Sequence, residues 1–227
     1  MIAILAHDGA VRIYDPGVIP AVIPAILLAA GKSTRMGRSK ALLPLGPGKT
    51  AETFLTHLIA TFHAAEIDDV VVVVGYEAAA IVDALQSRGT DARVVVNEDY
   101  EAGQLTSLLA GLRLVDHPGV VAALVMLVDV PLVAVSTVRA LVQRYRETRA
   151  PIVRPVRGAR HGHPVLIDRT LFDPLRAIDP SQGANVVVHA YASAAGDVEV
   201  TDEGAFADVD TPAEYDALVA RARSALE

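Results

Sequence analysis

The chain has 227 residues, of which 52% are hydrophobic and 4% aromatic, which fits one compact α/β domain with a sizeable core. Its formal net charge of −7 argues against a nucleic-acid-binding protein, because such binding depends on a basic surface. The absence of cysteine excludes disulfides, thiolate metal sites and cysteine nucleophiles.

Residues 1–24 differ in character from the rest of the chain and are interpreted as an N-terminal extension. Turn signals at Asp8-Gly9 and Asp15-Pro16-Gly17 flank a short segment, Val11 to Tyr14, that suits one half of a small hairpin. The apolar stretches are too short, or too interrupted by charge and proline, for a signal peptide or a membrane span. We therefore expect a soluble cytoplasmic protein with no membrane partner.

Residues 25–227 are predicted to form one domain in which strands alternate with helices. Strands are predicted at 25–30, 70–75, 92–96, 121–128 and 151–154. Helices are predicted near 51–65, 77–87, 104–114 and 136–148. Several strands are apolar throughout, as expected where helices cover both faces, so the fold class is α/β with a doubly wound, mostly parallel sheet. This is a Rossmann-like arrangement of three layers, α/β/α.

The elements become shorter after Pro151 and are predicted to form a small mixed subregion. Val165 to Ile167 and Val198 to Val200 are its candidate strands. Beyond them, Thr211-Pro212-Ala213-Glu214 is typical of a capping box with proline at the first helical position, and predicts where the last helix begins.

The loop after the first strand of the domain, Gly31 to Lys40, has the composition of a polyphosphate site. Glycine lets backbone N–H groups approach anionic oxygens, and the cationic side chains offset negative charge. The Walker spacing fails because Met36 stands where its second glycine belongs, and the dinucleotide fingerprint fails at Ser33. What remains is the pattern L-A-A-G-x-S-x-R-M-G-x-x-K, with a nucleoside triphosphate as the expected ligand.

This pattern resembles that of the MobA-like nucleotidyltransferases, in particular the molybdenum cofactor cytidylyltransferases. Further motifs follow in the family's order across roughly residues 25 to 220: Asn97 with Gly103 and Ser107, Val128-Asp129-Val130-Pro131, Gly162-His163-Pro164 and Asp208-Val209-Asp210-Thr211-Pro212. The resemblance implies a Mg²⁺-dependent enzyme that transfers CMP from CTP to a small phosphorylated acceptor such as molybdopterin, with a partner oxidoreductase as a possible recipient of the product.

The resemblance also implies roles for particular residues. Arg35 is expected at the β and γ phosphates and Lys40 at the α-phosphate, while Asp129 and Asp210 are expected to hold Mg²⁺ and His163 to lie on the acceptor side. The residues expected around the donor nucleotide are Leu28, Ala29, Ala30, Gly31, Ser33, Thr34, Gly75, Asn97, Gly103 and Thr106. Asp129 directly follows an apolar run, where an uncompensated carboxylate is costly, which independently favours a bound cation.

Several alternatives remain open at this stage. If Arg35 and Lys40 do not bind phosphate, they are ordinary solvated charges on the surface. If Asp129 does not bind metal, it caps the helix that begins near Ser136. If His163 does not contact the acceptor, it belongs to a structural turn. Asp208 either contacts metal or orients its loop, Lys32 and Arg38 are taken as solvated, and the oligomeric state is not predicted.

The donor base and the acceptor are also open. Gln104 stands where the cytidylyl pattern usually has methionine, and the segment from Ser181 to Asn185 lacks the cations typical of molybdopterin enzymes. GTP is therefore an alternative donor, and a sugar phosphate, an alcohol phosphate or a phospholactate-like acid is an alternative acceptor. A further alternative is a non-catalytic nucleotide-binding accessory protein.

Overall fold

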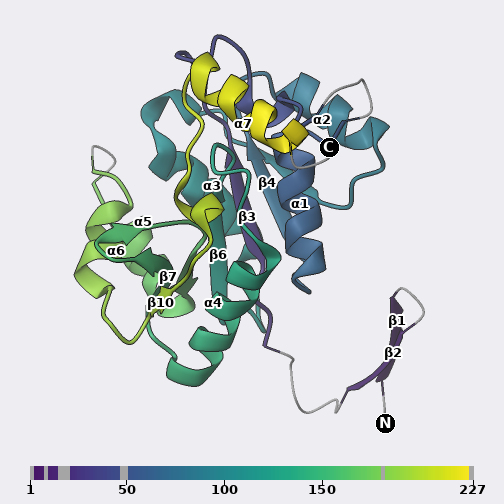
Figure 1. Cartoon of the computed structure of the whole chain (residues 1–227). Coiled ribbons are helices and arrows are strands. Elements are labelled where there is room, and N and C mark those ends of the chain that lie inside the picture. Colours follow the sequence, from purple (N-terminus) through teal and green to yellow (C-terminus); the bar gives the residue numbers. More distant parts are fainter. Residues whose placement is uncertain (1–2, 8–9, 15–20, 47–50, 180–181, 225–227) are drawn as a thin grey trace.

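The centre of the molecule is an eight-stranded mixed sheet with the strand order β10-β7-β9-β6-β3-β4-β5, to which β8 adds by pairing with β7 (Figure 1). The computed structural model describes residues 3–7, 10–14, 21–46, 51–179 and 182–224. The strands of this sheet are β3 (Ala25–Ala29), β4 (Val70–Val74), β5 (Arg93–Val96), β6 (Ala122–Leu127), β7 (Ile152–Arg157), β8 (Arg160–His161), β9 (Val165–Asp168) and β10 (Asp197–Glu199).

Most strands of the sheet run in one direction, as predicted. β3 pairs in parallel with β4 and β6, β4 with β5, and β7 with β10. β9 lies antiparallel between β6 and β7, and β8 is antiparallel to β7. The doubly wound sheet is confirmed, and the mixed subregion begins where β9 enters it.

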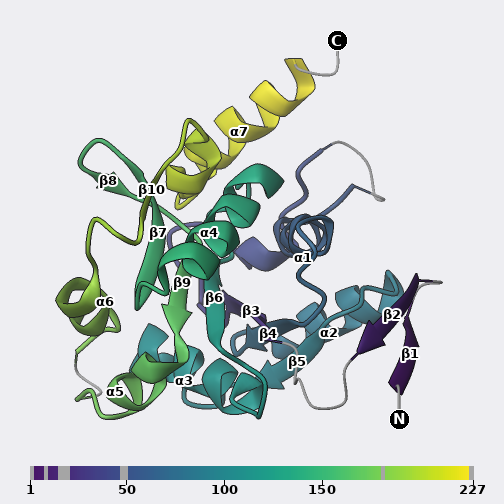
Figure 2. The same cartoon turned by 90° about the horizontal axis from the view of Figure 1, so that it is seen from below.

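Helices cover both faces of the sheet, which gives the three predicted layers (Figures 1 and 2). Their bounds are α1 (Phe54–Ala64), α2 (Ala78–Ser87), α3 (Gln104–Val115), α4 (Val135–Thr148), α5 (Phe172–Arg176), α6 (Asn185–Tyr191) and α7 (Pro212–Ser224), with 3-10 turns η1 (Lys40–Leu42), η2 (Tyr100–Ala102), η3 (Arg169–Leu171) and η4 (Glu203–Phe206). Alternate strand residues face opposite layers. Leu27 and Val72 pack in the cluster that contains α1, α2 and α4, whereas Ile26 and Val71 pack with α3, α5 and α6.

Two element boundaries differ from the prediction for identifiable reasons. The first helix of the domain begins at Phe54, because Thr53 caps it through a reciprocal pair of hydrogen bonds with Thr56. β7 continues through Pro155 to Arg157, whereas the predicted strand ended at residue 154. The ladder avoids the missing N–H of proline, because Arg154 N donates to Gly196 O and Val156 O accepts from Val200 N.

The capping box at the start of the last helix is confirmed. Glu214 N donates to Thr211 Oγ1 at 3.3 Å, and Glu214 Oε2 accepts from the backbone N–H groups of Thr211 and Asp210, each at 2.8 Å. α7 then packs Tyr215 into a cluster with Met36 from the basic loop, and the Tyr215 hydroxyl donates to Pro44 O. The last helix thus holds the loop that follows β3.

Near the N-terminus, β1 (Ala3–His7) and β2 (Ala10–Tyr14) form a separate antiparallel pair, in agreement with the hairpin predicted at this point. The turn signals Asp8-Gly9 and Asp15-Pro16-Gly17 lie outside the described residues. Among the helices that the structure describes, none has both the length and the apolar character needed to cross a bilayer.

Candidate active site

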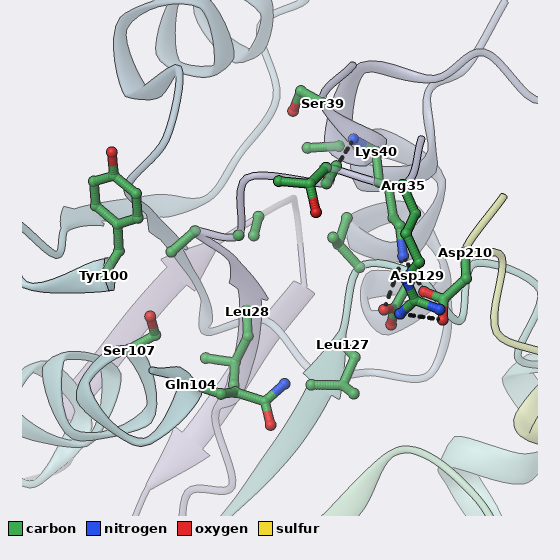
Figure 3. A pocket seen from close by; sticks show the side chains of 17 residues that line it. Leu28, Arg35, Ser39, Lys40, Tyr100, Gln104, Ser107, Leu127, Asp129 and Asp210 are labelled. Carbon is green, nitrogen blue, oxygen red and sulfur yellow. Dashed lines mark hydrogen bonds and ion pairs between the residues drawn. The ribbon is translucent and has the colours of Figure 1, made fainter. Parts of the chain in front are cut away.

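A cavity of about 300 Å³ opens at the carboxyl ends of β3 and β6, the edge at which parallel α/β sheets bind ligands (Figure 3). Its walls come from the end of β3 and the loop after it, the η2 turn with the start of α3, the end of β6 and the loop after it, and Asp210 in the segment that leads into α7. The lining residues are Leu28, Ala29, Ala30, Gly31, Ser33, Thr34, Arg35, Ser39, Lys40, Ala41, Tyr100, Gln104, Ser107, Leu127, Val128, Asp129 and Asp210.

The loop after β3 is folded by its own backbone. Ser33 has a φ of 50°, and its carbonyl oxygen accepts hydrogen bonds from the N–H groups of Met36 and Gly37, both at 3.0 Å. Gly37 has a φ of 72°, in the left-handed region that glycine adopts without strain. Met36 is 5% exposed and packs in a cluster with Tyr215 and Leu218 of α7. This packing anchors the loop before it reaches Lys40.

Four charged side chains meet at one end of the cavity. Lys40 Nζ lies 2.5 Å from Asp210 Oδ1 and 3.3 Å from Asp129 Oδ2, and Arg35 Nη2 lies 2.7 Å from Asp210 Oδ2 (Figure 3). The Lys40 side chain is 9% exposed, whereas that of Arg35 is 70% exposed. The hydrogen bond from Lys40, with the charge of Arg35 nearby, holds the pKa of Asp210 below its usual value.

Asp129 has the surroundings expected of a cation ligand. Its Oδ1 is buried and has no hydrogen-bond partner among the described residues, which is costly for a carboxylate oxygen. Its backbone oxygen accepts from Val209 N at 2.8 Å, so the loop after β6 is tied to the segment that carries Asp210. Two carboxylates beside a basic loop are a donor set that suits a divalent cation such as Mg²⁺.

The alternative role considered for Asp129, capping α4, is taken by another residue. Asp202 Oδ2 accepts from Ala134 N at 2.8 Å and from Thr137 Oγ1 at 2.7 Å at the start of that helix. Asp208 is exposed and is not among the residues that line the cavity. Within the described part of the chain, no group of three or more histidine and acidic residues forms a metal cage.

Four of the residues expected around the nucleotide are not among those that line the cavity: Gly75, Asn97, Gly103 and Thr106. Asn97 Nδ2 donates to Thr106 Oγ1 at 2.9 Å and to Ser107 Oγ at 3.0 Å, and Thr106 Oγ1 donates to Gly103 O at 2.8 Å. These contacts shape the turn that leads into α3.

The other lining residues were not predicted as site residues from the sequence: Ser39, Ala41, Tyr100, Gln104, Ser107, Leu127 and Val128. Tyr100 is an aromatic residue that stands between Asn97 and Gly103, two positions of one motif, and this position in the sequence indicates a place near the site.

A second cavity, of about 220 Å³, adjoins the first and shares Leu28, Gln104 and Leu127 with it. Its other lining residues are Leu108, Val125, Arg154, His161, Gly162, His163, Val165, Ile167, Ala184, Asn185, Val188 and His189. Burial lowers the pKa of His163 against the opposing effect of the Asp129 charge, so its imidazole is neutral at physiological pH. Arg154 Nε is paired with Asp197 Oδ1 at 2.9 Å.

Curated relatives cover most of the chain. Purine catabolism protein PucB from Bacillus subtilis is 32% identical and covers 88% of this chain and 96% of its own length. Nicotine blue oxidoreductase from Paenarthrobacter nicotinovorans is 32% identical, with coverage of 83% and 92%. A probable molybdenum cofactor guanylyltransferase from Mycobacterium avium is 29% identical, with coverage of 89% and 97%.

Solved structures agree in fold. Rv0371c from Mycobacterium tuberculosis H37Rv matches with a TM-score of 0.73 and 30% identity, covering 89% of this chain and 100% of that one. A complex of Rv0371c with manganese matches with a TM-score of 0.66 and 28% identity, covering 88% and 98%.

The family model for the MobA-like NTP transferase domain matches residues 25–198, a range that contains the basic loop, Asp129 and His163. Asp210 lies beyond this range and reaches the cavity through its contacts with Arg35 and Lys40. The family resemblance of the sequence is therefore confirmed, and the chain belongs to the MobA-like NTP transferase family of nucleotidyltransferases.

Proposed function

We propose that this nucleotidyltransferase requires Mg²⁺ and transfers CMP from CTP to a phosphorylated acceptor such as molybdopterin, with release of pyrophosphate. The observation that carries this proposal is the convergence of Arg35, Lys40, Asp129 and Asp210 at one end of a single cavity. Binding of a nucleotide alone would not require the whole set of two cations and two carboxylates around one cavity end.

In the proposed reaction, an acceptor phosphate oxygen attacks the α-phosphorus of the donor, and the bond from that phosphorus to the bridging oxygen breaks. Negative charge accumulates on the leaving pyrophosphate, so catalysis depends on cations and on alignment. Arg35, which is mostly exposed, is proposed to contact the β and γ phosphates, and Lys40, which is buried, is proposed to contact the α-phosphate. Mg²⁺ held by Asp129 and Asp210 would neutralise further phosphate charge when bound.

The preference for CTP is supported by Ala30. This residue lines the cavity, is 4% exposed, and precedes Gly31, where the guanylyl branch of the family tends to carry an additional glycine. A methyl group here narrows the cavity and favours the smaller pyrimidine. GTP is the second candidate donor, because relatives of this chain are named molybdenum cofactor guanylyltransferases and because Gln104 replaces the methionine usual in the cytidylyl pattern.

The second cavity is proposed to hold the body of the acceptor, because it adjoins the donor cavity at Leu28, Gln104 and Leu127. Its mainly apolar walls suit a heterocycle better than a polyhydroxylated sugar. His163, being neutral, is placed to hydrogen-bond to the acceptor rather than to neutralise a phosphate. The remaining acceptors are a sugar phosphate, an alcohol phosphate and a phospholactate-like acid. A molybdenum oxidoreductase that receives the finished cofactor is the proposed protein partner.

The test is a screen of CTP, GTP, ATP and UTP against molybdopterin and these other acceptors, with Mg²⁺ present and pyrophosphate release as the readout. We expect release with CTP and molybdopterin, and loss of at least about a hundredfold in the Asp129→Ala variant. Asp216→Ala is the matched control, since Asp216 is exposed on α7 and lies outside the cavity. Turnover in Asp129→Ala equal to that of the wild type contradicts the proposal.

One relative is named an oxidoreductase, so the same preparations are assayed for oxidation of reduced nicotinamide cofactors. Cofactor oxidation without pyrophosphate release from any triphosphate would replace the transferase proposal. Nucleotide binding without release would point to an accessory protein.

A further inference from the structure

The two ends of the main cavity differ in chemistry. Arg35, Lys40, Asp129 and Asp210 gather at one end, and Tyr100 stands at the other, with Leu28 and Gln104 between them (Figure 3). A nucleoside triphosphate has the same polarity, since it is anionic at one end and carries a planar heterocycle at the other. With its phosphates at the charged end, its base is directed toward Tyr100.

Tyr100 is held in place from behind by Gly75, the residue that follows β4. A Cβ atom on Gly75 would lie 2.7 Å from both Cβ and Cγ of Tyr100, a distance that real Cβ contacts do not show. The backbone at the end of β4 therefore touches the base of the tyrosine side chain, and any side chain at position 75 would displace the ring. This explains the presence of a glycine that does not itself line the cavity.

A charged pair lies next to the same ring. Lys32 Nζ is 5.9 Å from the centre of the Tyr100 ring and 2.5 Å from Glu101 Oε1, so this contact joins the basic loop to the η2 turn. The side chains of Lys32 and Glu101 are 46% and 64% exposed, so solvent screens their interaction and it contributes little to stability. The close approach of Gly75 to the base of the Tyr100 side chain, by contrast, leaves no room for a side chain at position 75 without a shift of the ring.

We propose that Tyr100 is the aromatic wall on which the base of the donor nucleotide stacks, and that Gly75 is a positioning residue that leaves room for its ring. This inference rests on the proposed function, because it needs a nucleotide donor. Stacking on an aromatic ring is available to every base, so Tyr100 provides affinity for the donor without choosing between cytosine and guanine. That choice falls to groups along the base edge, such as Ala30 and Gln104.

The test is calorimetric binding of CTP and of GTP, each with Mg²⁺ and without acceptor, to the full chain and its variants. We expect Tyr100→Phe to bind within about twofold of the wild type, and Tyr100→Leu to lose about tenfold in affinity for both nucleotides. Gly75→Ala should lose affinity by a similar factor, although it adds only one methyl group outside the cavity. Tyr191→Leu is the matched control, because Tyr191 is 46% exposed on α6.

Thermal unfolding of each variant separates a local effect from loss of fold, and affinities are compared for the folded fraction. Wild-type affinity in Tyr100→Leu overturns the inference, as does an equal loss in Tyr100→Phe, which would assign the role to the hydroxyl group. A loss in Tyr100→Leu that is confined to one of the two nucleotides contradicts the claim that the ring serves both bases. Failure of the proposed function has a different signature: the wild type then binds neither triphosphate, which also removes the role of Tyr100.

Discussion

Lys40 and Asp210 are in contact across 170 positions of the chain, with Nζ and Oδ1 separated by 2.5 Å. The same ammonium group lies 3.3 Å from Asp129 Oδ2, so it occupies the space between the two carboxylates proposed to hold metal. Arg35 and Lys40 thus pair with Asp210, and Lys40 also with Asp129 Oδ2, whereas Asp129 Oδ1 has no partner among the described residues. We expect the negative charge of a bound triphosphate to compete for Arg35 and Lys40, which would leave the carboxylates available to a cation.

We therefore predict that metal binding depends on nucleotide. In titrations of Mn²⁺ followed by electron paramagnetic resonance, the wild-type protein should bind the ion weakly alone and at least about tenfold more tightly with triphosphate present, after correction for Mn²⁺ bound by free nucleotide. Lys40→Met should bind Mn²⁺ more tightly than the wild type when nucleotide is absent, because the competing ammonium group is gone. Identical affinities for wild type and Lys40→Met without nucleotide would disprove this competition.

The ion cluster also predicts a dependence of stability on pH. Because the hydrogen bond from Lys40 lowers the pKa of Asp210 from its ordinary value of 3.8, the stabilisation is present above that value and is lost as the pH falls through the lower folded-state pKa. The free energy of unfolding in urea should differ between the wild type and Asp210→Asn by a constant amount from about pH 7 to about pH 5. Below pH 3.8 this difference should shrink, and a difference that grows there would contradict the assignment.

Asp202 is predicted to stabilise α4 and, with it, the loop that carries Asp129. Its carboxylate accepts hydrogen bonds from Ala134 N, Thr137 Oγ1 and Gly204 N. Asp202→Ala should lower the free energy of unfolding by about 1 to 2 kcal/mol, as for other lost helix caps. Urea denaturation measures this loss. The reference variant is Asp216→Ala, because Asp216 is an acidic residue of α7 whose side chain is exposed.

Ala30 gives a prediction about base choice. Removing its methyl group in Ala30→Gly widens the cavity beside Gly31 and should shift the ratio of kcat/KM for CTP and GTP toward GTP by about tenfold, the usual effect of one methyl group in a pocket. Pyrophosphate release with each donor gives this ratio, which is independent of the active fraction of the preparation. An unchanged ratio would place base selection elsewhere, with Gln104 as the next residue to vary.

The sheet, and the convergence of the basic loop and Asp129 at one edge of it, could be predicted from the sequence. Both depend on short-range hydrophobic patterns and on one rule about parallel sheets. Apolar runs defined β3 and β6, and the rule that parallel strands present their carboxyl ends at one edge brought Gly31 and Asp129 together. The antiparallel direction of β9 was not predictable, because the periodicity of a strand carries no information about its direction.

Contacts between side chains that are far apart in the sequence could not be predicted either. Asp202 caps α4 from 68 positions beyond Ala134, and no local pattern indicates such a pairing. Asn97 and Thr106 were expected to face the nucleotide, but a motif does not show whether its polar groups bind a ligand or each other, and here they bind each other. Tyr100 was not predicted although it lies between two motif positions, because its contact with Gly75 joins the end of β4 to the η2 turn and no local pattern indicates that contact.

The packing of α7 on the basic loop has a consequence for shortened forms of the protein. Every strand of the central sheet precedes Asp210 and Tyr215 in the chain. A product that ends after Glu199 would contain all the strands, but it would leave Arg35 and Lys40 without their acidic counterpart at position 210 and Met36 without its packing partner Tyr215. The presence of the complete sheet in a fragment is therefore not sufficient for the ionic cluster.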